Sequence, residues 1–220
     1  DGRAAGALVL VRDVTDVRRR ERALVTKDAT LREVHHRIKN NLQMVAALLR
    51  MQSRRLDSGE AKAALADAGH RIGAIALVHE ALSVSPEGEV DFDGVCDRIL
   101  AMVSELVPLA RVHREGRIGR VASDLATPLA MSLTELVANA AQHAGAGNEV
   151  RVNLRLRRGD DRLQLTVEDD GPGLPPGFDA EEHGRLGVGI VLALVSEVSG
   201  TVSWSSRSGG GTRAEIHVPA

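Results

Sequence analysis

The chain has 220 residues, a formal net charge of −2 and one cysteine, Cys96, and its length suits two small domains. A charge this close to zero gives no overall basic field for nucleic acid, and one cysteine excludes a disulfide framework and a cysteine zinc site. No apolar run approaches the roughly 20 residues that span a bilayer and no signal peptide opens the sequence, so we expect a cytoplasmic protein that neither inserts into a membrane nor binds nucleic acid directly.

The chain opens on a segment that we interpret as the end of a domain lying upstream. Residues 7–11 form an apolar run of strand length, and a lone strand is not stable in water. We therefore assign residues 1–12 to the end of a truncated domain and residues 13–30 to a helical linker. The basic run at residues 18–22 has two interpretations, a site for an acidic partner or a solvated signalling connection.

The segment from residue 31 has the hydrophobic spacing of an amphipathic helix. Leu31, Ile38 and Val45 recur at intervals of seven, and Val34 and Leu48 fall between them. This apolar row predicts a helix that continues to about residue 56.

A turn and a second helix follow. Residues 57–59 have the turn sequence Asp-Ser-Gly, and residues 60–83 carry another apolar stripe. Two helices joined by a short turn form an antiparallel hairpin, here over residues 31–85, which leaves one apolar face open. We expect a second copy of the chain to cover that face, so that a homodimer forms a four-helix bundle.

His36 lies on the first of these helices, on the side opposite the apolar row. Lys39, Asn40 and Gln43 are expected to share its outward face, and His35 lies at the flank of the seam. One interpretation is an ordinary exposed histidine. The other is an imidazole that another molecule must reach, and the second half of the chain decides between them.

From residue 90 the pattern changes to mixed α and β, after a break at residues 85–88. We expect helices that begin at Asp93, at Ser123 or Asp124 with Pro128 in the first turn, and near Gly189. We expect strands at residues 111–114, 150–156, 163–167, 202–204 and 214–218. Helices followed by an antiparallel or mixed sheet indicate an α+β sandwich over residues 90–220.

The first chemical signal in this domain is a polar helix stripe. Glu135 and Asn139 are one helical turn apart, and Gln142 and His143 lie a further turn along. Carboxylate and amide oxygens facing one cavity are suited to a magnesium–phosphate unit. The alternative for this stripe taken alone is a solvated helix face.

The second signal is Asp-Asp-Gly-Pro-Gly at residues 169–173. Asp169 continues the alternation of Leu163, Leu165 and Val167, which predicts a buried carboxylate at the end of a strand. A buried carboxylate needs a donor partner, and an adenine amino group is a suitable one. The alternative is an exposed turn after a strand.

The third signal is a glycine-rich segment, residues 184–190, directly before an apolar helix. Glycines that open a helix expose backbone N–H groups at its positive end, where anions bind. The spacing differs from the dinucleotide-binding fingerprint, because no βαβ unit precedes it. The alternative is an ordinary glycine-rich turn.

Together and in this order, these signals resemble the histidine kinases over nearly the whole chain. Residues 133–140 resemble the N box, residues 169–173 the first glycine box and residues 186–190 the second. Residues 211–212 match the terminal Gly-Thr of the ATPase domain, and residues 35–43 resemble the phosphoacceptor helix of the HisKA_2 subgroup, relatives of the HWE kinases.

A narrower resemblance concerns residues 6–15 and 75–83, which are similar to soluble actinobacterial sensor kinases of this group. It implies that residues 1–12 are the closing strand of a PAS sensor domain. It also implies a response regulator with an RNA-binding antiterminator output as partner.

The resemblance assigns roles residue by residue. It implies a GHKL (Bergerat-type) ATPase domain after the hairpin, with His36 as the phosphoacceptor and Glu135 assisting proton removal or metal positioning. Asn139 would ligate Mg²⁺, and Asp169 would hold the adenine amino group of ATP. The other residues implied at the nucleotide are His143, Gly171, Gly173, Gly187, Gly189 and Thr212.

The function implied is that of a sensor histidine kinase, an ATP-dependent protein-histidine kinase that passes the phosphoryl group to an aspartate of a response regulator. Two alternatives are a non-catalytic phosphotransfer or scaffold protein with a degenerate ATPase domain, and an ATP-hydrolysing machine of the same superfamily. Residues 174–185 make the ATP lid short, and Phe178 is the only aromatic residue there.

Overall fold

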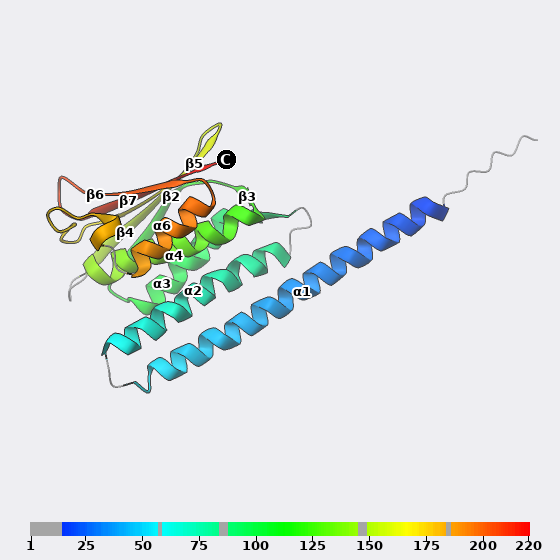
Figure 1. Ribbon diagram of the computed structural model, residues 1–220, viewed down its shortest axis with the longest axis horizontal. Helices are drawn as coiled ribbons and strands as arrows, with labels where there is room; N and C mark the ends of the chain where they lie inside the picture. Colours follow the sequence, from blue (N-terminus) through cyan, green and yellow to red (C-terminus); the bar gives the residue numbers. More distant parts are fainter. Residues whose placement is uncertain (1–14, 57–58, 84–87, 145–148, 184–185) are drawn as a thin grey trace, which may run out of the picture.

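The computed structural model describes residues 15–56, 59–83, 88–144, 149–183 and 186–220, so the expectations for residues 1–12 lie outside the described residues. A helical hairpin consists of α1 (Thr15–Ser53) and α2 (Gly59–Ser83), and an α/β part follows it (Figure 1). The N-terminal half of α1 extends past the end of α2 as a single rod (Figure 1). Among the described residues, no helix combines the length and hydrophobicity needed to cross a membrane.

The two hairpin helices pack through small side chains. Gly69 of α2 lies against Ala46 and Leu49 of α1, and Ala46 is buried. Val45 and Leu48, which belong to the apolar row of α1 predicted from the sequence, do not take part in this helix–helix contact. They remain 42% and 50% exposed. The prediction that the hairpin leaves an apolar face open is therefore confirmed for the chain by itself.

The α/β part is built on one mixed five-stranded sheet in the order β2-β4-β5-β7-β6. Its strands are β2 (Ala110–Gly116), β4 (Val150–Arg158), β5 (Arg162–Asp169), β6 (Thr201–Ser206) and β7 (Thr212–Pro219). β2 pairs with β4 in parallel and the other pairs are antiparallel, which confirms the predicted mixed sheet and the final hairpin. Two short strands, β1 (Glu89–Asp91) and β3 (Arg120–Ala122), pair separately and have no counterpart in the sequence prediction.

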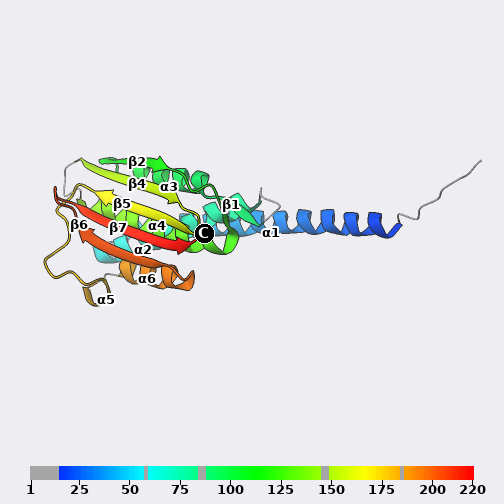
Figure 2. The ribbon, with the colours of Figure 1, turned by 90° about the horizontal axis from the view of Figure 1, so that it is seen from above.

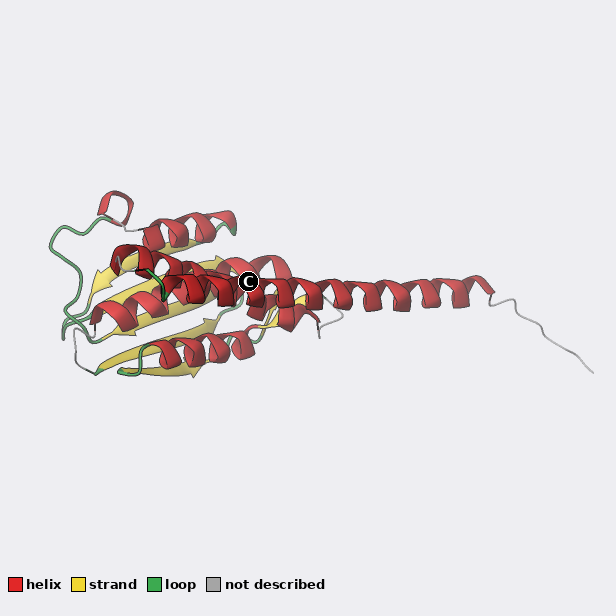
Figure 3. Cartoon of the chain, turned by 90° about the horizontal axis from the view of Figure 1, so that it is seen from below, coloured by secondary structure: helices red, strands yellow, loops and turns green. Residues whose placement is uncertain are grey.

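Helices cover one face of this sheet and leave the other uncovered (Figures 2 and 3). They are α3 (Phe92–Leu106), α4 (Ser123–Ala144) and α6 (Leu186–Glu197), and the short α5 (Ala180–His183) lies beside α6 at the edge. The core lies between the two layers, where Leu165 of β5 stands between Leu156 and Ile216 on the neighbouring strands. Alternation along each strand places such apolar side chains on the covered face, which confirms the α+β sandwich.

Three local details differ from the sequence prediction. The N-cap of α3 is Asp91, whereas Asp93 accepts the backbone N–H groups of Ile118 (2.9 Å) and Gly119 (3.2 Å). Pro128 lies deeper in α4 than the first turn. The third helix begins at Leu186 rather than near Gly189, because the glycine-rich segment itself forms its first turn.

Candidate active site

A cavity of about 320 Å³ lies beside α4, the ends of β5 and β7, and the start of α6. Most of its wall is apolar, and the polar side chains that reach it belong to Asn139, Asp169 and Thr212. A pocket of this kind, largely apolar with a few convergent polar groups, suits a flat heteroaromatic ligand with a defined hydrogen-bond pattern. The second and third sequence signals therefore meet at one place.

Asp169 is the buried polar group of this cavity, with 7% of its surface exposed. Its Oδ1 accepts hydrogen bonds from the backbone N–H of Gly171 (2.9 Å) and of Thr212 (3.1 Å). Within the described part of the chain, no donor is recorded at Oδ2. One carboxylate oxygen thus holds the side chain in place, and the other is free to accept from a ligand.

Two turns, one at Gly173 and one at Gly211, pack against each other next to Asp169, and both positions favour glycine. Gly173 and Gly211 have φ of +82° and +93°, which side chains rarely adopt. A side chain on Gly211 would collide with the backbone carbonyl of Asp169, and one on Gly173 would lie 3.3 Å from the carbonyl oxygen of Gly211. The bare backbones let the first glycine box and the final hairpin pack directly on each other.

The polar stripe of α4 divides between two surroundings. Asn139 faces the cavity, whereas the carboxylate of Glu135, one turn earlier, contacts the hairpin. The Nε of Arg71 in α2 donates to its Oε1 at 2.5 Å and the Nη2 donates to its Oε2 at 3.1 Å. These hydrogen bonds raise the pKa of the Arg71 guanidinium above its ordinary value. Sequence reasoning could not find Arg71, because its role depends on how α2 packs on α4.

The glycines of the second box differ in what they require. A Cβ on Gly187 would lie 2.7 Å from Oε2 of Glu135, so a side chain there would require this carboxylate to shift. No atom lies within 4 Å of the corresponding position on Gly189, so space does not explain that glycine. Both residues flank Val188, which lines the cavity. The side chain of His143 lies outside the described residues.

Two aromatic residues complete the cavity wall. Phe178 comes from the short lid segment, and Trp204 comes from β6. Sequence analysis did not assign Trp204 to the site, although Val202 and Trp204 alternate with exposed residues and pair with Ile216 and Ala214. The sequence alternation groups Val202 and Trp204 on one face of the strand, and only the packing of β6 on β7 shows that Trp204 borders the cavity.

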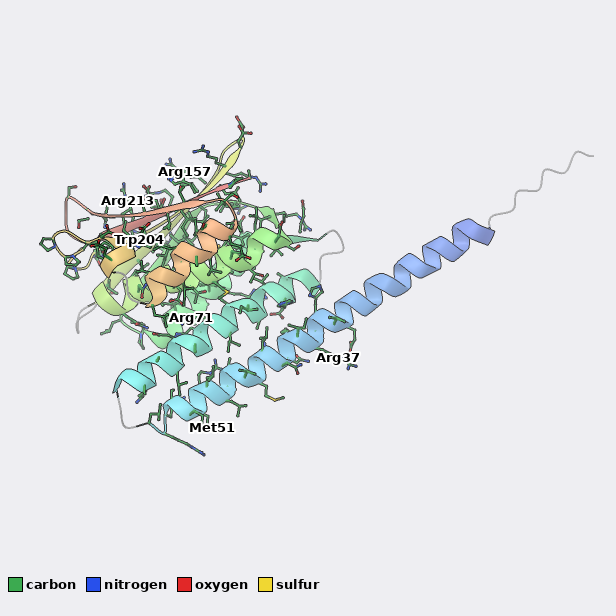
Figure 4. The ribbon with its side chains drawn as sticks, in the orientation of Figure 1. Arg37, Met51, Arg71, Arg157, Trp204 and Arg213 are labelled. Carbon is green, nitrogen blue, oxygen red and sulfur yellow. The ribbon has the colours of Figure 1, made fainter. Side chains whose placement is uncertain are left out.

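On the hairpin, His36 is exposed and His35 is half-buried. Nδ1 of His35 lies 3.2 Å from Nδ1 of His79 in α2, so His35 contributes to the seam. Burial, and then the charge of His35, lower the pKa of His79. His36 is thus the neighbour that another molecule can reach; the side chain of Arg37, next in sequence, lies on the outer side of α1 (Figure 4).

The expectation that Lys39 shares this outward face is wrong. Its Nζ donates to Glu80 of α2 at 2.9 Å, and Glu80 also accepts from Nη1 of Arg98 in α3 at 3.0 Å. The bond from Lys39 is the main cause that lowers the pKa of Glu80. A long side chain can turn towards the neighbouring helix even when its Cα lies off the seam.

Two family models match the chain. The HisKA_2 histidine kinase model covers residues 33–107, and the model for histidine kinase-, DNA gyrase B- and HSP90-like ATPases covers residues 125–220. The chain belongs to the histidine kinase family. This confirms the resemblance and the fold class predicted from the sequence, a helical HisKA_2 domain followed by a GHKL ATPase domain.

Several histidine kinases are similar over most of the chain. The sensor histidine kinases PdtaS of Mycolicibacterium smegmatis and Mycobacterium tuberculosis H37Rv are 46% and 47% identical over 99% of it. The chain spans 45% of the length of each. The solved histidine kinase domain of the Erythrobacter litoralis EL346 blue-light-activated kinase is 26% identical with a TM-score of 0.64, and the match covers 90% of this chain and 94% of that one.

Proposed function

We propose that this chain is the catalytic core of a cytoplasmic sensor histidine kinase that transfers the γ-phosphoryl group of ATP to His36. One observation carries the proposal: two features occur in the same chain. His36 is exposed, and a cavity contains the buried carboxylate of Asp169, whose Oδ2 is free to accept a hydrogen bond. Membership of the histidine kinase family supports it.

In this proposal the cavity holds the adenine base. Oδ2 of Asp169 accepts from the exocyclic amino group, while Trp204 and Val188 contribute apolar wall against the rings. A base without that amino group would leave the carboxylate oxygen buried and unpaired, which costs binding free energy. The cavity would therefore prefer adenine. The triphosphate would extend towards Asn139 and the first turn of α6, where backbone N–H groups favour anions.

The residues at the phosphate end suit Mg²⁺ bound together with ATP. Among the described residues, no group of three or more His, Cys, Asp and Glu side chains could hold a metal. Mg²⁺ in phosphoryl-transfer sites uses one or two protein oxygens and completes its shell with phosphate oxygens and water. Asn139 can supply such an oxygen. The ion, when bound, neutralises negative charge on the transferring group.

The role of His36 is that of the nucleophile. A neutral imidazole has a lone pair on one ring nitrogen at physiological pH, so no strong base is needed to create it. Catalysis then consists mainly of positioning and charge stabilisation. The phosphoryl group would pass to an aspartate of a response regulator, and the resemblance implies one with an RNA-binding antiterminator output.

We further propose a homodimer through the uncovered row of α1. Val34, Val45, Leu48 and Met51 are each more than 40% exposed in the chain alone. Two copies that bury these rows against each other would form the four-helix bundle. The segment before residue 13 would close a PAS sensor domain.

The proposal is tested by incubating the protein with γ-labelled ATP and Mg²⁺ and mapping the phosphorylated residue. We expect label on His36, loss of label in His36→Gln and retention in His35→Gln. An unlabelled wild type that accepts a phosphoryl group from a phosphorylated regulator would instead indicate a phosphotransfer protein. Release of free phosphate at the same rate in wild type and His36→Gln would indicate an ATP-hydrolysing machine.

A further inference from the structure

Arg71 joins the hairpin to the nucleotide-binding part through a two-point ion pair. Its guanidinium donates to both carboxylate oxygens of Glu135, and the two side chains are only 16% and 9% exposed. In Figure 4, Arg71 lies on the side of α2 that faces the α/β part. A shielded bidentate pair of this kind is stronger and more directional than an exposed one.

The same carboxylate is confined on its other side. Oε2 of Glu135 lies so close to Gly187, in the first turn of α6, that a Cβ there would be 2.7 Å away. Glu135 is also one helical turn from Asn139, the residue facing the nucleotide cavity. The carboxylate is therefore adjacent to the phosphate end of the site, yet both of its oxygens are engaged by the hairpin.

This arrangement keeps Glu135 away from the phosphoacceptor. The contacts of His35 with His79 and of Lys39 with Glu80 place His36 at the level of residues 79–80 of α2. Arg71 comes eight residues earlier, which corresponds to about 12 Å along the helix. Helical side chains also lean towards the N-terminus, which for Arg71 is the direction away from His79. While it is paired with Arg71, the carboxylate of Glu135 is therefore too far from His36 to exchange a proton with it, since proton transfer needs a separation of about 3 Å.

We propose that Arg71 is a positioning residue that holds Glu135 out of the reaction, and that phosphoryl transfer to His36 requires this ion pair to open. The inference rests on the proposed kinase function. Opening the pair releases a carboxylate next to the phosphate end of the cavity. It also frees the nucleotide-binding part to move along α2 towards the level of His36.

The kinetic test compares Arg71→Met, which keeps the side-chain length but removes the charge, with Arg71→Lys, which keeps the charge. We expect Arg71→Met to raise the maximal rate of His36 labelling about fivefold or more, the usual lower range for a coupling energy. The KM for ATP should stay unchanged, and Arg71→Lys should restore a rate close to wild type. A lower rate in Arg71→Met would overturn the proposal, because Arg71 would then support Glu135 in the reaction.

Arg98→Met is the matched control. It breaks another ion pair between the hairpin and the α/β part, that of Arg98 with Glu80, without touching Glu135. We expect it to change the labelling rate much less than Arg71→Met does, because this pair is 41% and 36% exposed and therefore weaker. An equal increase in Arg98→Met and Arg71→Met would overturn the proposal, because general loosening of the two parts would explain both.

Hydrogen–deuterium exchange of the nucleotide-free protein supplies a readout that does not need kinase activity. Arg71→Met should speed exchange in the facing segments of α2 and α4, and Arg71→Lys should not. Unchanged exchange in Arg71→Met would show that the ion pair with Glu135 does not hold α2 and α4 together, and would overturn the proposal. Faster exchange with an unchanged labelling rate would show a purely structural contact and would also overturn the proposal. A wild type without His36 labelling fails the proposed function itself, a result distinct from either of these.

Discussion

The hairpin and the α/β part bury very different side chains. In the α/β part, large residues such as Phe92, Ile99, Leu129 and Leu154 are completely buried. Among the hairpin side chains that the structure describes, the buried apolar ones are small, namely Ala46, Ala74, Ala76, Val78 and Ala81. Several large apolar side chains on α1 stay exposed, among them Met44 at 64% and Met51 at 49%.

This difference separates the two tasks of a histidine kinase core. A nucleotide is enclosed, so the part that holds it needs a rigid core around a cavity. In the proposed function, the phosphoacceptor must be reached by the nucleotide-binding part and then by a second protein, and the exposed position of His36 suits this role. The hairpin packs on α4 through α2 and, in the proposed dimer, on a second copy through α1.

The largest effect on stability is expected in the α/β core. Leu129→Ala removes a completely buried side chain from α4 and should lower the free energy of unfolding by about 2–5 kcal/mol. Leu48→Ala in α1 is the matched change at a half-exposed site. It should lower the free energy of unfolding of the monomer by less than about 1 kcal/mol. Urea denaturation at low protein concentration measures both. Similar losses at the two sites would remove the contrast between the regions.

Nucleotide affinity should depend strongly on the cavity carboxylate. Asp169→Asn keeps an acceptor for the N–H groups of Gly171 and Thr212 but turns an amide donor towards the adenine amino group. Losing a hydrogen bond to a charged group should weaken ADP binding about tenfold to a hundredfold.

Trp204 offers a direct measurement of that affinity. It lines the cavity, it is the only tryptophan, and the chain has no tyrosine. Its fluorescence can therefore be followed during ADP titration. Asp170→Asn is the control, since Asp170 is exposed and its Oδ1 accepts from the backbone N–H of Arg151. Equal affinities for wild type and Asp169→Asn would contradict the assignment of Asp169.

Self-association should depend on the apolar row of α1. Replacing Val45 and Leu48 together by Ser removes two half-exposed side chains that a partner would bury, at about 1 kcal/mol each, half the value for a fully exposed side chain. The dimer constant from analytical ultracentrifugation should weaken at least about tenfold. Ala47→Ser, at an exposed position between them, should have little effect. A wild type that stays monomeric would rule out this row as the dimer interface.

The smallest predicted effect is a pH dependence of hairpin stability. Burial is the main cause that lowers the pKa of both His70 and His79 below the ordinary 6.5, so folding favours their neutral forms. The two histidines do not reduce the free energy of unfolding above about pH 6.5, where both are neutral. As the pH falls below that value, protonation favours the unfolded chain and the free energy of unfolding decreases. The Tm should decrease between about pH 7.5 and about pH 5.5. His79→Gln should reduce the slope, and an unchanged slope would exclude His79 as a cause.

The sequence by itself determined the parts of this protein that depend on local spacing. Alternation along residues 163–169 placed Asp169 on the buried face, and helical spacing placed His36 on the exposed one. The first glycine box and the terminal Gly-Thr located the turns around the cavity, because residues other than glycine rarely adopt the backbone at Gly173 and Gly211. Even locally, neighbouring residues compete: Asp91 rather than Asp93 caps α3, because Asp93 is engaged by Ile118 and Gly119.

Only the tertiary structure decided which surfaces meet. The sequence predicted an open apolar face on the hairpin, but only the packing showed that Ala46 contacts α2 while Val45 and Leu48 stay exposed. The pair of Arg71 and Glu135 and the place of Trp204 in the cavity wall join residues far apart in sequence. Such contacts follow from the packing of whole elements, which buries the most apolar area for the complete chain, and no local pattern carries that information.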